Sequence, residues 1–162
     1  MRFRRSIIDA EGYRANVGIV LTKGSGQLFW GKRAGMEAWQ FPQGGIRPRE
    51  TVEKAMFREL REETGLLPEH VEVLGCTQNW LRYRLPDRYV RRNSNPVCIG
   101  QKQIWYLLRL VADDGSVRLD CSRQPEFDHW CWIDFRQPAL RVVEFKRQVY
   151  RRALDELASL LL

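Results

Sequence analysis

The sequence has little of what builds histidine metal centres or membrane spans. Its 162 residues include only two histidines, His70 and His129, which are too few and too far apart for a histidine-based metal site. No run of about eighteen apolar residues occurs, so we expect no membrane-spanning helix. Residues 1–5 are basic, but no apolar run with a small-residue cleavage site follows them, so we expect no secretory signal.

Cysteine is scarce, and its spacing excludes a thiol-based metal site. The four cysteines show neither a C-x-x-C spacing nor a zinc pattern; they are Cys76, Cys98, Cys121 and Cys131. Free or buried thiols in a reducing compartment explain them better than disulfides, so we expect a cytoplasmic protein. Repeats and low-complexity linkers are also absent. The length suits one domain, which we predict over residues 13–162, preceded by an N-terminal arm over residues 1–12.

What the sequence has in excess is positive charge. Lysine and arginine outnumber the acidic residues by 27 to 20, for a formal net charge of +7. Such an excess favours a polyanionic partner, of which nucleic acid is the first candidate, although the charge could serve only solvation. The stretch from Trp80 to Arg92 interleaves arginines with aromatic residues, as phosphate contacts and base stacking require. The alternative is an exposed loop or hairpin tip with solvated arginines.

Short apolar runs separated by turn signals predict a sheet. We expect strands near residues 17–21, 27–33, 71–77, 101–111 and 130–133, the first two forming a hairpin. From about Pro138 to the end the pattern predicts helix. With Val142 as origin, Lys146 falls inside the apolar face and Phe145 at its edge. We interpret this face as the wall of a cleft, although Phe145 alone could be ordinary core.

The stretch from Gly44 to Leu66 predicts a glycine-rich loop followed by an acidic helix. Glu50 or Thr51 stands where a helix N-terminus favours an oxygen side chain, and Gly65 suits the left-handed position that ends a helix. At about 100° per residue, Val52 and the apolar residues one turn later mark the face that meets the core. Three glutamates continue that same face: Glu59, Glu62 and Glu63.

A buried acidic face needs compensation by positive charge. Like charges on a half-buried surface repel and raise one another's pKa unless a cation lies among them. Oxygen ligands at this density suit a hard cation, Mg²⁺ or Mn²⁺. The alternative is a surface helix on which Arg58 and Arg61 pair with the glutamates.

This loop and helix resemble the Nudix box, the signature of hydrolases that act on nucleoside diphosphates linked to another group. The fixed positions of the box are all filled, by Gly44, Glu50, Arg58, Glu59, Leu60, Glu62, Glu63, Gly65 and Leu66. The resemblance implies an α/β class fold, an α/β/α sandwich around a mixed sheet. It also implies two or more Mg²⁺ ions, or Mn²⁺, bound by Glu59, Glu62, Glu63 and Glu126 with the Gly44 carbonyl.

The same resemblance implies roles for the remaining residues of the box. One of these four glutamates would be the general base, and coupled carboxylates resist a single assignment. Glu50, Arg58 and Gly65 would have structural roles, Arg58 by orienting a carboxylate. Judged from the residues alone, Glu126 could be no more than a polar loop residue before a strand.

Motifs outside the box resemble one bacterial branch of the family, the RNA pyrophosphohydrolases. The matching stretches include residues 12–18, 39–45, 79–83, 96–103, 125–128 and 145–152. The resemblance implies removal of pyrophosphate from the 5′-triphosphate end of RNA, which leaves a monophosphate and promotes mRNA decay. Arg14 and Lys146 would then contact phosphate, and Arg33 and Phe145 would sandwich a base. Two alternatives remain: hydrolysis of asymmetric dinucleoside tetraphosphates or other dinucleoside polyphosphates, and a module that binds RNA or a nucleotide without hydrolysing it.

Overall fold

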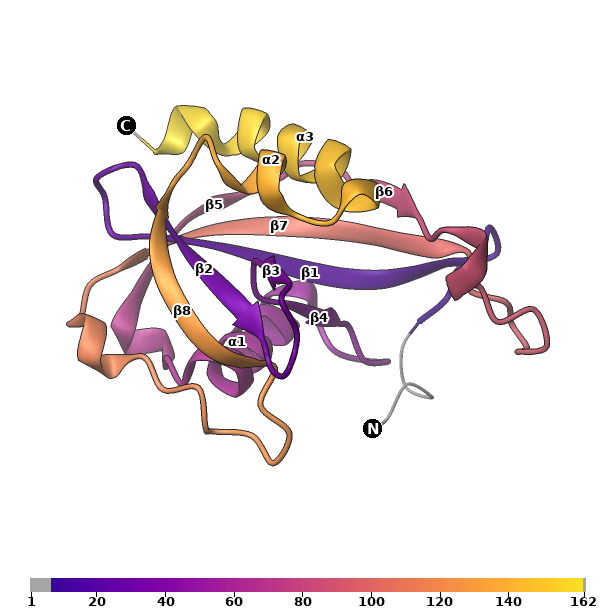
Figure 1. Ribbon diagram of the computed structural model, residues 1–162, viewed down its shortest axis with the longest axis horizontal. Helices are drawn as coiled ribbons and strands as arrows, with labels where there is room; N and C mark the ends of the chain where they lie inside the picture. The colour runs from indigo at the N-terminus through magenta and orange to yellow at the C-terminus, as the bar shows by residue number, and fades with distance from the viewer. Residues whose placement is uncertain (1–6, 162) are drawn as a thin grey trace.

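The computed structural model describes residues 7–161 and is organised around one mixed β-sheet (Figure 1). Its strands are β1 (Tyr13–Thr22), β2 (Gln27–Arg33), β3 (Trp39–Gln40), β4 (Gln43–Gly45), β5 (Val71–Cys76), β6 (Leu81–Arg84), β7 (Gly100–Leu110) and β8 (Phe127–Asp134). Its α-helices are α1 (Val52–Thr64), α2 (Pro138–Arg141) and α3 (Arg147–Leu157). Helix α1 covers one face of the sheet and α2 and α3 the other, so the predicted α/β/α sandwich is confirmed.

The centre of the sheet is the parallel pair of β1 and β7. The main order is β3-β2-β1-β7-β5, with β4 on β1, β6 on β7 and β8 on β2. The pairing of β1 with β7 runs from Tyr13–Gly100 to Thr22–Arg109. Both strands are buried almost throughout, as the interior strands of a parallel pair usually are.

The predicted hairpin of β1 and β2 exists only at its turn. The two strands pair at Thr22 and Leu28, and β2 then follows β8 for the rest of its length. The cause is that β4 occupies the same edge of β1 further along the strand, with Val17 opposite Gly44, while β7 fills the opposite edge. This arrangement brings the glycine-rich loop to the middle of the sheet.

Helix α1 packs on the sheet through its apolar face. Ala55, Met56 and Leu60 are completely buried against Val17 and Ile19 of β1. The acidic residues that continue this face are therefore brought to the edge of the core.

Helix α3 covers the opposite face and anchors the loop between β3 and β4. The Tyr150 ring stacks on Phe41 at 4.8 Å, and its hydroxyl accepts a hydrogen bond of 3.0 Å from the Phe41 N–H. Because Phe41 lies between Gln40 and Gln43, this contact fixes both glutamines relative to α3.

The prediction of a continuous helix from about Pro138 to the end of the chain is wrong. The chain is extended at Val142 and Val143, and a short 3-10 turn over Glu144–Lys146 precedes α3. The buried side chain of Val142 joins the core, and β-branched residues tolerate extended backbone well. Lys146 is consequently the residue at the start of α3, and Phe145 lies in the preceding turn.

Two other predictions concern the N-terminal arm and membrane-spanning helices. Residues 1–6 of the predicted N-terminal arm lie outside the described residues, and Ile8 forms an isolated bridge with Arg14. The division into an arm and a domain therefore stays a prediction. Within residues 7–161, no helix is both long and apolar enough to cross a membrane.

Candidate active site

The loop and helix expected between Gly44 and Leu66 are present. Thr51 is the N-terminal cap of α1, since its hydroxyl accepts a 3.1 Å hydrogen bond from the Lys54 N–H. Gly65 ends the helix in the left-handed conformation, with φ at 73°. The ends of α1 thus fall where the sequence predicts them, which fixes the angular positions of its glutamates.

Two glutamates of α1 are buried beside the glycine-rich loop. Glu59 is 8% exposed and Glu63 is 7% exposed. The Gln43 N–H donates a 3.1 Å hydrogen bond to Glu63 Oε1. A Cβ at Gly44 would overlap the Glu59 carboxylate, so only glycine allows the backbone of β4 to approach this closely.

Burial raises the pKa of both carboxyl groups. The effect is larger for Glu63, because the charges of Glu59 and then Glu126 raise its pKa further. For Glu59, the Arg58 guanidinium opposes the effect of burial. The pair therefore carries negative charge that the described residues compensate only in part.

Arg58 connects the helix to the loop. Its guanidinium donates to Glu50 at 2.8 and 2.9 Å, to Glu59 at 2.6 Å and to the Gly45 carbonyl at 2.8 Å. A planar fork can reach several acceptors in fixed directions, which an ammonium cannot do. Arg58 thus holds Glu59 beside the loop, with Glu50 as the second carboxylate of the network.

Glu62 does not share the buried face that the helical pattern predicts. Its side chain is 42% exposed and lies 3.6 Å from Arg58 and 4.0 Å from Arg47. The 100° spacing places Glu62 at the edge of the face, and two arginines hold it at the surface. Two of the three helix glutamates, not all three, converge in the interior.

The oxygen atoms of this site are suitable ligands for a divalent metal ion. Among residues 7–161, no three acidic, histidine or cysteine side chains meet closely enough to enclose an ion. Mg²⁺ usually takes only one or two carboxylates and completes its shell with water and substrate phosphates. Glu59 and Glu63, with the backbone of Gly44 beside them, fit such an ion. It would supply charge neutralisation and activation of water.

Glu126 joins the acidic pair to a basic cluster. It precedes β8, and its Oε1 accepts from Gln40 Nε2 at 3.4 Å and lies 3.5 Å from Arg33 Nε. The Lys146 ammonium donates to Gln40 Oε1 at 3.2 Å. Gln40 therefore bridges Glu126 and Lys146, which lie in segments of the chain about twenty residues apart.

Lys146 is buried although it is charged. It is 8% exposed, and burial, reinforced by the charge of Arg33, lowers its pKa to about 8. The charges of Glu126 and Glu63 offset this burial only in part, so the ammonium favours an incoming anion. A phosphate group would restore the solvation that Lys146 lacks.

A cavity of about 590 Å³ opens beside these residues. It is lined by Arg33, Phe145 and Lys146, by Gln40 and Gln43, and by Tyr83 and Tyr89. Phe145 lies between the two tyrosine rings, with centroids at 5.8 and 6.0 Å. The face of Lys146 and Phe145 is thus the wall of a cleft, as the sequence predicts.

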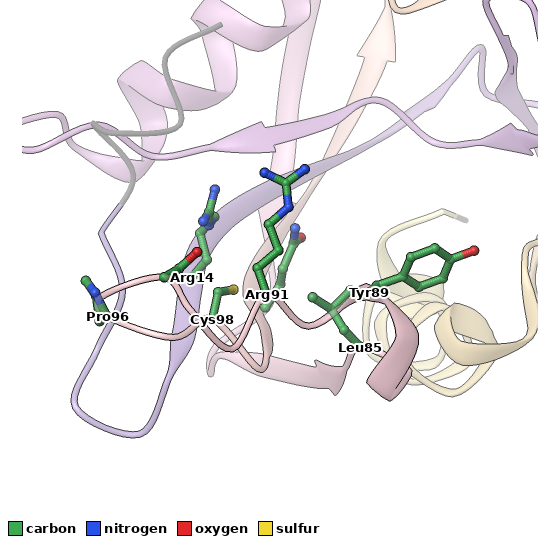
Figure 2. Close-up of a pocket in the computed structure, with 8 residues that line it drawn as sticks. Arg14, Leu85, Tyr89, Arg91, Pro96 and Cys98 are labelled. Atoms are coloured by element: carbon green, nitrogen blue, oxygen red, sulfur yellow. The ribbon is translucent and has the colours of Figure 1, made fainter.

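Arg14 lies elsewhere. It lines a second cavity of about 300 Å³, whose walls include Tyr89, Arg91 and Gln101 (Figure 2). Leu85, Tyr89 and Gln101 line both cavities, so the two are contiguous. The structure therefore places the two predicted phosphate residues, Arg14 and Lys146, in adjoining compartments of one groove.

Sequence reasoning assigned no role to the glutamines. Gln40 carries the link between Lys146 and Glu126, and Gln43 accepts a 3.0 Å hydrogen bond from the buried Gln103. Gln103 also donates to Asn16 at 2.8 Å. A sequence feature that could have indicated their role is the presence of amide side chains inside apolar stretches, where a buried polar group needs a hydrogen-bond partner.

A family model described as the NUDIX domain matches residues 12–153. The chain belongs to the NUDIX family. The resemblance of the loop and helix to the Nudix box is thereby confirmed, and it extends over nearly all of the described fold.

Curated relatives and a solved structure support this membership. A protein named RNA pyrophosphohydrolase from Alkalilimnicola ehrlichii is 61% identical over 155 residues, which cover 96% of this chain and 86% of the relative. One of the same name from Thioalkalivibrio sulfidiphilus is 63% identical, with 96% and 90% covered. The E. coli dihydroneopterin triphosphate pyrophosphohydrolase matches with a TM-score of 0.67 at 17% identity over 85% of this chain and 92% of that one, and shows likeness of fold alone.

Proposed function

We propose that this NUDIX protein removes pyrophosphate from the 5′-triphosphate end of RNA, leaves a 5′-monophosphate and so promotes mRNA decay. The observation that carries the proposal is the identity of about 60% with proteins named RNA pyrophosphohydrolase, over almost the whole chain. The site agrees with it, because buried carboxylates adjoin a cavity that offers cations and aromatic rings. A polyphosphate and a base need these two surfaces together.

Different residues of the site would bind the metal ions, bind the phosphate groups and accept a proton. Glu59 and Glu63, with Glu126, Glu62 and the Gly44 carbonyl, would hold Mg²⁺ or Mn²⁺, in two or more sites. Lys146 would bind phosphate oxygens and orient the 5′ end, and Arg14, in the adjoining cavity, would contact phosphate of the same RNA. One of the clustered glutamates would accept the proton of the attacking water, and the coupled pair is best treated as a unit. Positioning and charge neutralisation carry most phosphoryl chemistry.

Arg33 and Phe145 would receive a base of the RNA. Both line the larger cavity, together with Tyr83 and Tyr89. An aromatic ring stacks with any base, and an arginine can cover the other side of the base through its planar guanidinium. An RNA substrate, and cysteines that form no disulfide among the described residues, agree with action in the cytoplasm.

The decisive experiment compares two substrates in the presence of Mg²⁺. Short 5′-triphosphorylated RNA and diadenosine tetraphosphate are supplied in competition, and kcat/KM is measured for each. We expect RNA to be preferred, with pyrophosphate or phosphate released from its 5′ end. Preference for the dinucleotide would overturn the RNA assignment while leaving the metal site intact. Binding without cleavage of either would favour a non-hydrolysing module.

A further inference from the structure

The smaller cavity has the composition of an anion-binding site. Two arginines, Arg14 and Arg91, line it, and no carboxylate occurs among the described residues that do so. Figure 2 shows both guanidinium groups pointing the same way, while the Tyr89 ring extends in another direction. Ser94 and Cys98 also line this cavity. A net positive cavity without acidic residues favours phosphate over any cation.

Arg91 differs from the other arginines of its segment. Among residues 7–161, its guanidinium makes no ion pair, hydrogen bond or ring contact. The neighbouring Arg92 lies 3.7 Å from Asp87, and Arg88 lies over the Tyr89 ring at 4.7 Å. Arg91 is therefore the arginine of this loop that is both unpaired and directed at a cavity.

The position of the cavity relates it to the reacting end. It joins the larger cavity through Leu85, Tyr89 and Gln101. The acidic pair adjoins the larger cavity through Gln43, which bonds to Glu63. A chain whose 5′ end lies at the glutamates and whose base lies against Phe145 can continue past Tyr89 into the smaller cavity.

We propose that the cavity of Arg14 and Arg91 binds an internucleotide phosphate downstream of the 5′ end, so that the enzyme measures RNA beyond its first two nucleotides. This inference rests on the proposed RNA substrate. Arg91 supplies a charge-assisted contact to the RNA backbone, and Tyr89 lines both cavities. Contacts to phosphate fix the register of a strand and carry no base preference.

The test compares the activity of protein variants on RNA substrates of different length. Wild type, Arg91→Ala and Arg92→Ala are compared on 5′-triphosphorylated RNAs of two and six nucleotides with the same first two bases. We expect Arg91→Ala to lower kcat/KM about five- to tenfold for the longer RNA and to leave the dinucleotide unchanged. Arg92→Ala, from the same loop but paired with Asp87, should behave like wild type, and Arg91→Lys should recover part of the loss.

Two further readouts identify the contact as phosphate. The salt dependence of log kcat/KM for the longer RNA should become shallower by about 0.7 in Arg91→Ala. Neutral methylphosphonate linkages placed singly after the second nucleotide should lower kcat/KM in wild type at one position, and should cost nothing more at that position in Arg91→Ala.

The results distinguish failure of the downstream phosphate site from failure of the proposed function. If wild type cleaves triphosphorylated RNA but Arg91→Ala matches Arg92→Ala on the longer RNA, the downstream site is wrong and the proposed function stands. Equal losses on both lengths would assign Arg91 to the reacting end and also overturn the inference. If wild type prefers diadenosine tetraphosphate to both RNAs, the proposed function itself fails.

Discussion

The acidic side of the cleft comes from one segment of the chain, whereas the basic side is assembled from several. Glu59 and Glu63 lie one helical turn apart on α1, and Arg58 from the same helix holds the loop against them. Arg33, Arg91, Phe145 and Lys146 come from distant parts of the chain. Local periodicity therefore describes the first side and cannot describe the second.

The two sides also differ in how their charges are compensated. On the acidic side, Arg58 has three acceptors and is fully engaged by the protein. On the basic side, Lys146 has one amide partner, and Arg91 has no polar side-chain partner among the described residues. Full pairing suits a scaffold, and incomplete pairing suits a surface that binds an anion. The following four predictions test this contrast.

The largest effect should come from Glu63→Gln. We expect activity to fall about a thousandfold, since the change removes a charge from the site that would hold Mg²⁺. Without divalent ions the variant should be at least as stable as wild type, because it removes a buried charge. The raised pKa means that wild type loses stability as pH rises through that pKa, and the variant should lose less.

The matched control for Glu63→Gln is Glu53→Gln, which changes an exposed glutamate on the same helix. It should keep full activity and the same melting temperature. Glu62→Gln tests whether the exposed Glu62 also holds Mg²⁺: a loss close to that of Glu63→Gln agrees with the proposed metal role, whereas a mild loss would leave the ion to the buried pair.

Arg58→Ala should lower activity about a hundredfold, because the residue orients Glu59 without belonging to the charge that binds metal. It should also destabilise the fold by about 3 kcal/mol, since it leaves the carboxylates of Glu50 and Glu59 partly buried without a partner. Chemical denaturation and initial rates measure the two effects. Arg61→Ala, an exposed arginine of the same helix, is the control; equal effects from both would remove the proposed network.

Lys146→Met should lower kcat/KM for triphosphorylated RNA about tenfold, through loss of one charge-assisted contact. At pH 7 the variant should melt at a higher temperature than wild type, because it no longer buries an ammonium. Since the folded pKa of about 8 lies below that of a free lysine, this advantage should shrink as pH rises above 8. Arg151→Met, on the exposed side of α3, should change neither quantity, and a destabilised Lys146→Met would contradict the prediction.

The smallest effect should come from Phe145→Ala. Loss of one stacking surface should slow RNA cleavage about fivefold, with little effect on a free nucleotide. Kinetics on both substrates give the ratio. Phe135→Ala removes an exposed ring outside the lining of the larger cavity and should leave the ratio unchanged. Equal slowing of both substrates by Phe145→Ala would make Phe145 an ordinary packing residue.

The prediction of structure from sequence succeeded where the interactions are local. Helix α1 begins after Thr51 and ends at Gly65, as predicted, because capping depends on neighbouring residues. The continuous helix from Pro138 failed at Val142, whose burial in the core favours extended backbone over helix. Glu62 was misplaced because it lies at the edge of the apolar face of α1, where Arg58 at 3.6 Å and Arg47 at 4.0 Å hold its carboxylate at the surface.

By itself the sequence determined the family, the α/β class and the loop and helix that carry the glutamates, because a contiguous motif needs only local geometry. Only the tertiary structure decided which glutamates are buried, how Gln40 links Glu126 to Lys146, and that Arg14 and Arg91 share a cavity. These relations join residues far apart in the chain. Their distances are set by the packing of α1 and α3 on the sheet.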